Sequence, residues 1–130
     1  MVFNAYWWRN RWKHEVVTNI LDKKKPSSIK ATPELANFIS NLDKGNHLDK
    51  IITKAREKLS EDMFSGESVP KKQIPKYYFQ KYELNNLYVI NLDSSRRLSY
   101  TLVFNGTGVC CVLLEVFLTH KEYEKRFGYS

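Results

Sequence analysis

Two side chains that could act together on a phosphate stand at the ends of neighbouring predicted strands. Arg97 begins an alternating run, and His120 comes just after the almost unbroken apolar run 109–118. Strands joined by a hairpin are antiparallel, so the start of one and the end of the next meet at the same end of a sheet. A guanidinium grips phosphate oxygens, and an imidazole exchanges protons near neutral pH. The pair therefore indicates chemistry on a phosphate.

Three short runs near the C-terminus predict the strands that would position this pair. Residues 87–92 form a β-type run that ends in a polar turn, and residues 97–104 alternate strictly between apolar and polar. The sequence Asn-Gly-Thr-Gly at 105–108 is a hairpin signal, because tight hairpin turns need positive φ at their central positions. The run 109–118 suits a central strand buried on both faces. Together these runs predict an antiparallel meander.

Capped helices surround the predicted meander. Residues 28–31 are expected to form a short first strand, and a helix follows over 32–42, where a threonine N-cap precedes a proline and a glutamate. A second apolar stripe at helical spacing covers 48–59, and the short link makes the two helices an antiparallel hairpin that must lie on a sheet. A capping box at 119–122 opens a last helix. The expected class is α+β, with the order β-α-α-β-β-β-α and an extra N-terminal helix.

Size and charge restrict the class of protein. The chain has 130 residues, enough for one domain with a small appendage, and its net charge of +7 and pI near 9.4 favour a polyanionic partner such as RNA, DNA or an acidic protein. No apolar stretch reaches the roughly 18 residues of a membrane span, and no export signal is recognised. We therefore expect a cytoplasmic protein without stable membrane insertion.

The thiols and imidazoles do not show the spacing of a metal site. Cys110 and Cys111 are adjacent, so on a strand they point to opposite faces and cannot easily pair. Two buried thiols fit a reducing compartment. The three histidines are scattered, with His14 and His47 expected at the surface. We expect neither a metal nor a cofactor.

The first 28 residues differ from the rest and form a separate basic and aromatic extension before a main domain over 29–130. Aromatic residues alternate there with arginines and lysines, and a run of three lysines, a proline and two serines ends the extension as a linker. A helix to about Leu21 could dock its aromatic face on the main domain. The same residues could instead stack on nucleic-acid bases or lie on a membrane surface.

A second basic and aromatic segment precedes the meander, with three tyrosines and a phenylalanine among lysines. Such interleaving can hold phosphates and stack bases. Alternatively, the aromatic rings cover the sheet while the lysines stay in water. The residues assigned to RNA binding, one of them from the last helix, are Lys71, Lys72, Lys76, Lys81 and Arg126.

The order of elements and four sequence markers resemble the RelE/ParE superfamily of toxins from toxin–antitoxin pairs. The markers are Ala-Thr-Pro-Glu at 31–34, the segment 82–88, Ser-Arg-Arg-Leu-Ser-Tyr-Thr at 95–101 and the ending 118–129. The resemblance covers residues 29–129. It implies a RelE-like fold, in which a helical hairpin packs on an antiparallel sheet.

The RelE branch consists of RNases that cut messenger RNA, typically on the ribosome, through attack of the ribose 2′-OH on the adjacent phosphate. By this resemblance Arg97 would bind the scissile phosphate, His120 would be the general acid, and Tyr123 would orient or stack the substrate base. The implied partners are mRNA, the ribosome and a cognate antitoxin. Other readings place Arg97 in a surface ion pair, His120 in the helix start and Tyr123 in the core.

One part of the RelE pattern is missing from this chain. Val89 and Asn91 stand where members of that branch often carry lysines on the strand. The alternatives are therefore a histidine-centred ribonuclease site, aided by Lys76 or Lys81, or an inactive RelE-fold module that binds RNA or protein. A third is a ParE-like inhibitor of a topoisomerase.

Overall fold

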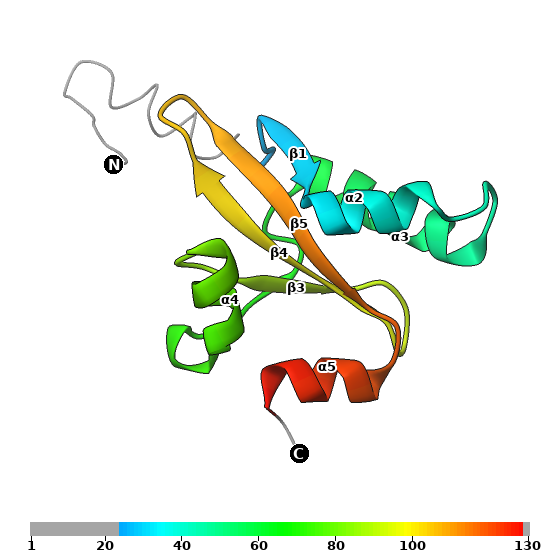
Figure 1. Cartoon of the computed structure of the whole chain (residues 1–130). Helices are drawn as coiled ribbons and strands as arrows, with labels where there is room; N and C mark the ends of the chain where they lie inside the picture. The colour runs from blue at the N-terminus through cyan, green and yellow to red at the C-terminus, as the bar shows by residue number, and fades with distance from the viewer. Residues whose placement is uncertain (1–23, 129–130) are drawn as a thin grey trace.

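The computed structural model describes residues 24–128, so the expected N-terminal helix lies outside the described part of the chain. Within these residues, strands and helices alternate in nearly the predicted order (Figure 1). They are β1 (Ser28–Ala31), α2 (Pro33–Ser40), α3 (His47–Glu61), β2 (Glu67–Ser68), the 3-10 helix η1 (Lys71–Gln73), α4 (Lys76–Tyr82), β3 (Tyr88–Asn91), β4 (Arg97–Phe104), β5 (Val109–Phe117) and α5 (His120–Phe127).

One five-stranded sheet has the order β1-β5-β4-β3-β2. The predicted meander of β3, β4 and β5 is antiparallel and is confirmed, as is the α+β class. The prediction of an antiparallel sheet is wrong for β1, which pairs in parallel with β5 from Ser28 opposite Cys110 to Ala31 opposite Leu113. Parallel neighbours need a long crossover, and here the rest of the chain between β1 and β5 provides it.

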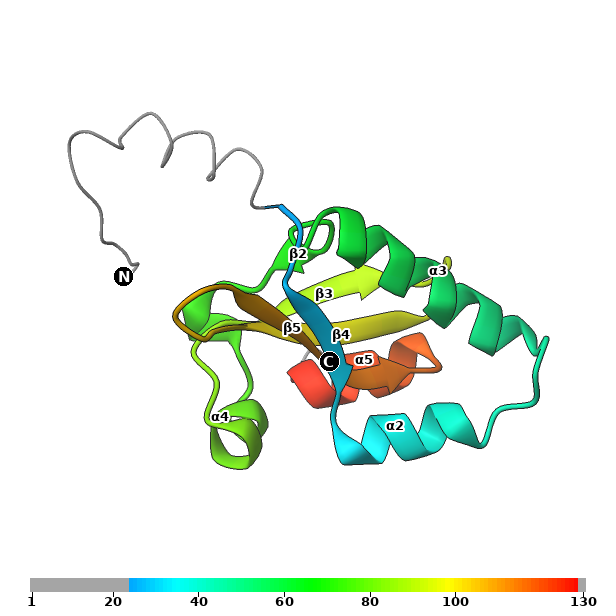
Figure 2. The ribbon, with the colours of Figure 1, turned by 90° about the horizontal axis from the view of Figure 1, so that it is seen from above.

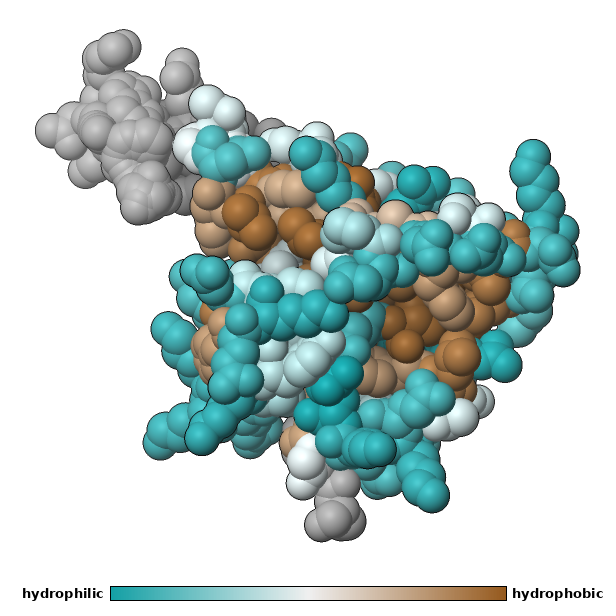
Figure 3. Space-filling model, in the orientation of Figure 1, coloured by the Kyte–Doolittle hydropathy of each residue, from teal (hydrophilic) through white to brown (hydrophobic). Residues whose placement is uncertain are grey.

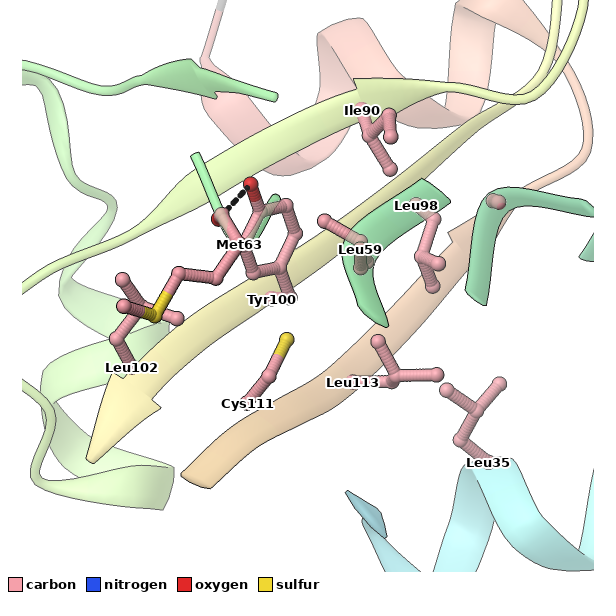
Figure 4. Packing of buried hydrophobic residues seen from close by; sticks show 10 residues of the cluster. Leu35, Leu59, Met63, Ile90, Leu98, Tyr100, Leu102, Cys111 and Leu113 are labelled. Carbon is pink, nitrogen blue, oxygen red and sulfur yellow. Dashed lines mark hydrogen bonds between the residues drawn. The ribbon is translucent and has the colours of Figure 1, made fainter. Parts of the chain in front are cut away.

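Helices cover both faces of the sheet. Helices α2 and α3 both contribute to the core cluster on one face, where Figure 2 shows them spread apart rather than side by side, while α4 and α5 contribute to the cluster on the other face (Figure 1). Strand β4 alternates between the two layers, because Leu98, Tyr100 and Leu102 point toward the layer of α2 and α3. In this layer the Tyr100 hydroxyl donates a hydrogen bond to the Met63 carbonyl at 2.8 Å (Figure 4).

Helix α4 is absent from the predicted order of elements. Pro75 precedes it, and no side chain caps its first turn. Its seven residues are too few for a clear apolar stripe, and Tyr78 is the one that is fully buried. The ring of Tyr78 lies 6.0 Å from that of Phe127 in α5, so packing between the two helices stabilises α4 where local sequence does not.

The main domain begins to make contacts just before β1. Met63 donates its backbone N–H to the Lys24 carbonyl at 2.6 Å, and Ser27 donates to Val109 at 2.8 Å. Residues 24–27, which were assigned to the extension, are thus held against the domain. In the described residues, no helix is both long enough and apolar enough to cross a membrane.

Candidate active site at one end of the sheet

Arg97 and His120 meet at the end of the sheet where β4 begins and β5 ends. Nη1 of Arg97 lies 3.0 Å from Nδ1 of His120. The register pairs Arg97 with Phe117, three residues before His120, and Thr119 then caps α5 by accepting the Glu122 N–H. The predicted convergence of the two side chains is confirmed. His120 is exposed and Arg97 is half-buried, so both can reach a bound molecule.

The contact assigns the protons of the imidazole. A guanidinium can only donate, so Nδ1 of His120 accepts and the ring proton of the neutral form is on Nε2. That nitrogen lies 3.4 Å from Oε2 of Glu124, one helical turn further along α5. An arginine on one side and a carboxylate on the other therefore hold the ring in one orientation.

Tyr123 completes the group. The guanidinium carbon of Arg97 lies 4.5 Å from the centre of the Tyr123 ring, within the range of a cation–π contact. The ring also packs on Phe117 and Phe127, with centroids 5.6 and 4.6 Å away. The Tyr123 ring thus contacts both the aromatic core and the guanidinium of Arg97. Because the five N–H groups of Arg97 lie in the guanidinium plane, the contact with the ring face does not compete with the bond from Nη1 to His120.

A cavity of about 340 Å³ adjoins Arg97 and Tyr123. Its other walls are residues 65–67 and 89–91. Glu67 pairs with Val89, and Asn91 pairs with Arg97, so these four side chains lie on the same face of the sheet as α5. Val89 and Asn91 therefore both line the cavity, and neither contributes a charge to it.

The wall at 65–67 lies unusually close to the strand beside it. A Cβ on Gly66 would be 2.8 Å from the Tyr100 hydroxyl and 2.8 Å from the Val89 carbonyl. The Gly66 N–H donates to the same hydroxyl at 3.0 Å. Only glycine fits this approach, which brings Glu67 to the cavity.

The residues predicted to bind RNA lie outside this cavity lining. Lys71 and Lys72 are exposed on η1, and Lys76 is exposed at the start of α4. Lys81 is already engaged, because Nζ donates to the Tyr77 hydroxyl at 3.1 Å and pairs with Glu34 at 3.0 Å, and both bonds raise the pKa of Lys81.

Arg126 is also engaged within the protein. Its Nε and Nη2 donate to the two carboxylate oxygens of Glu115 at 3.2 and 2.9 Å, and its guanidinium stacks on Tyr77 at 3.6 Å. This pairing gives Arg126 a structural partner that the sequence did not indicate.

The sequence analysis did not predict a buried polar cluster that Tyr78, Ser99 and Glu115 form next to the site. Tyr78 is fully buried, and its hydroxyl lies 2.5 Å from Oε1 of Glu115 and 3.2 Å from Oγ of Ser99. Burial, reinforced by the bond to Glu115, raises the pKa of Tyr78 well above its usual range. Glu115, an acid inside the apolar run 109–118, could have indicated this cluster, because a carboxylate on a buried strand needs a hydrogen-bonding partner.

A second, smaller cavity of about 180 Å³ lies between α2 and β5. Apolar side chains dominate its walls, including Phe38, Leu114, Val116 and Leu118, and Figure 3 shows the apolar surface beside α2. It holds no group suited to acid–base chemistry apart from Glu34 and Glu115, which are both in ion pairs.

Within residues 24–128, no three His, Cys, Asp or Glu side chains gather closely enough to hold a metal ion. His47 is exposed, as expected, and His14 lies outside the described residues. Cys110 and Cys111 are buried and unpaired with each other. Comparisons of the chain with protein family models, with curated proteins and with solved structures found no significant match.

Proposed function

We propose that this protein is an endoribonuclease of the RelE type, a cytoplasmic toxin of a toxin–antitoxin pair that cuts mRNA on the ribosome without a metal. The observation that carries the proposal is the contact between Arg97 and His120 at 3.0 Å, beside an open cavity. Transesterification of RNA needs a base, an acid for the leaving oxygen and a cation for the charge on the phosphorane, and His120 and Arg97 could supply the acid and the cation. The α+β architecture and its antiparallel meander are compatible with a RelE-like fold.

In the proposed reaction the ribose 2′-OH attacks phosphorus and the bond from phosphorus to O5′ breaks. The products are a 2′,3′-cyclic phosphate and a 5′-OH. Arg97 would stabilise the charge that develops on the phosphorane oxygens. His120 would protonate the leaving O5′, and Tyr123 would support the cation or stack on a base.

Binding of the phosphate would change the state of His120. While Nδ1 accepts from Arg97, the ring cannot bind a second proton there. A phosphate attracts the guanidinium more strongly than a neutral ring does, so Arg97 would move from the imidazole to the substrate. Nδ1 could then be protonated, and Glu124 would stabilise the imidazolium through Nε2. The acid would thus form when RNA is bound.

Glu67 is the best candidate for the general base. It is the acidic side chain among the described residues that line the cavity, and it is exposed. Register places it on the same face as Arg97, two strands away. A carboxylate there would take the role that the strand lysines fill in the RelE pattern.

The direct test incubates the purified protein with RNA, with and without ribosomes, and maps the new ends. A 2′,3′-cyclic phosphate and a 5′-OH at each cut support the proposal. Intact RNA under both conditions would overturn it.

A non-catalytic RNA-binding module is the second candidate, because Val89 and Asn91 leave the β3 wall of the cavity without a cation. This function predicts that the protein leaves RNA intact. The affinity of the protein for RNA should then fall steeply as salt is raised, since counterions are released on binding. The same incubation therefore separates the two functions when it is combined with a salt titration of binding.

A further inference from the structure

We propose that Glu115 is a positioning residue for the site, acting through Arg126 to place helix α5, and with it His120 and Tyr123, against Arg97. This inference rests on the proposed ribonuclease function only for its kinetic consequence. The placement of the helix can be tested without any RNA.

An irregularity in β5 aims Glu115 at α5. Ser99 pairs with Glu115, but the next residue of β4, Tyr100, pairs with Leu113, so Leu114 is the extra residue of a β-bulge. Leu114 belongs to the core layer of α4 and α5, and Glu115 reaches the same layer through Tyr78 and Arg126. Without the bulge, strict alternation would place these neighbours on opposite faces.

The hydrogen bonds of the cluster run in one direction, toward the carboxylate. Tyr78 has one hydroxyl proton, and the charged oxygen of Glu115 at 2.5 Å is the stronger acceptor, so the Ser99 hydroxyl donates to Tyr78 at 3.2 Å. Arg126 donates two further bonds to Glu115. The Glu115 side chain is only 19% exposed, and removal of any donor would leave buried charge less well compensated.

One side of α5 carries both Arg126, which binds Glu115, and the two site residues of the helix. His120, Tyr123 and Arg126 follow one another at intervals of three residues, so they lie along one side of α5. The strand end holds the first turn, where Leu118 donates to Glu122, and Glu115 holds the last turn through Arg126. A rotation of the helix about its axis would therefore move Arg126 and Tyr123 together. The Glu115 pair resists that rotation.

The test uses Glu115→Gln, which keeps the size of the side chain but turns an amide N–H toward Arg126. Glu34→Gln is the matched control, because it removes a carboxylate from an exposed ion pair, with Lys81 at 3.0 Å. The readout without RNA is the NMR shift of the Arg97 side-chain protons, which the ring of Tyr123 at 4.5 Å displaces upfield. We expect that displacement to shrink in Glu115→Gln and to persist in Glu34→Gln.

The kinetic readout separates positioning from binding. We expect kcat for RNA cleavage to fall about 10- to 100-fold in Glu115→Gln, because a small misplacement of reacting groups has effects of this size. KM should change much less than kcat, since Arg97, which is assigned to bind the phosphate, is on β4 and keeps its place. Tyr78→Phe, which removes one donor to Glu115 and keeps the ring, repeats the comparison if Glu115→Gln does not fold.

The two proposals fail in different ways. If the wild-type protein does not cut RNA, the proposed function is overturned and the NMR comparison alone decides the role of Glu115. If Glu115→Gln behaves like Glu34→Gln in both the Arg97 shift and kcat, Glu115 does not position α5.

Discussion

Arg97 donates to Nδ1 of His120 at 3.0 Å, and the same guanidinium lies over the ring of Tyr123. The three side chains come from β4 and α5, which are separated in the chain by the whole of β5. One cation therefore contacts both residues of α5 that are assigned to the site.

Arg97→Ala should reduce RNA cleavage about 100- to 1,000-fold, the usual effect of removing one group that stabilises a developing oxyanion. The neighbouring Arg96 provides a matched control, because its side chain pairs with Asp93 at 3.5 Å instead. Cleavage rates of a short RNA should be close to wild type in Arg96→Ala. Equal losses in the two variants would contradict the assigned role of Arg97.

The neutral ring of His120 should carry its proton on Nε2. Long-range proton–nitrogen NMR spectra of the wild-type protein with a neutral ring would show Nδ1 as the acceptor. In Arg97→Ala the Nδ1 resonance should shift, because its donor is gone, while exposed His47 should stay the same. A proton on Nδ1 in the wild type would be incompatible with the observed contact.

Tyr100→Phe should lower the free energy of unfolding by about 1–3 kcal/mol, the cost of leaving buried polar groups unpaired. The hydroxyl is buried and binds both the Met63 carbonyl and the Gly66 N–H. Urea unfolding measures the loss. Tyr88→Phe is the control, since the ring of Tyr88 is half-buried and stacks on Tyr100 at 5.2 Å. Its substitution should lower the free energy of unfolding much less.

Cys111 should resist alkylation in the folded protein. Burial, with a smaller effect of Cys110, raises the pKa of the Cys111 thiol to about 12. At pH 8 the reactive thiolate is then roughly one part in ten thousand. Mass spectrometry of Cys110→Ser after iodoacetamide treatment should show labelling in urea and none in buffer. Rapid labelling in buffer would mean that β5 opens readily.

The protein should lose stability as the pH rises above about 9. Burial raises the pKa values of Cys111, Tyr78 and Tyr100 in the folded state, so the unfolded chain releases these protons first. Their contribution is complete below the unfolded values, 9.0 for the thiol and 10.0 for the phenols, and it is lost as the pH rises further. Urea midpoints at pH 8, 9 and 10 test this. A constant midpoint would contradict it.

Local patterns were sufficient for the elements with strong signals. The N-cap at Thr32 accepts the Leu35 N–H, and Thr119 caps the last helix by accepting the Glu122 N–H as expected. The Glu122 side chain accepts from Leu118, one residue before the N–H that a capping box uses. Period-two alternation placed Leu98 and Tyr100 on one buried face. Such signals are readable because each depends on neighbours within about four residues, so no distant segment is needed to interpret them.

Features that depend on distant partners were not readable. Helix α4 has no cap and only seven residues, so it exists because Tyr78 packs on Phe127 and bonds to Glu115. The parallel pairing of β1 with β5 depends on the path of the whole chain between the two strands. The bulge at Leu114 depends on the pairing of β5 with β4. It turns the Glu115 side chain to the face of the sheet that α4 and α5 cover.

The amino-acid order alone was enough to predict that Arg97 and His120 come together. A hairpin joins their strands, so the start of the first strand and the end of the second lie at the same end of the sheet. The amino-acid order could not show that Arg126 holds Glu115 while Lys81 holds Glu34, since a charged side chain chooses among partners by distance in the folded state. Which of the cations predicted to bind RNA are engaged within the protein was therefore settled by packing.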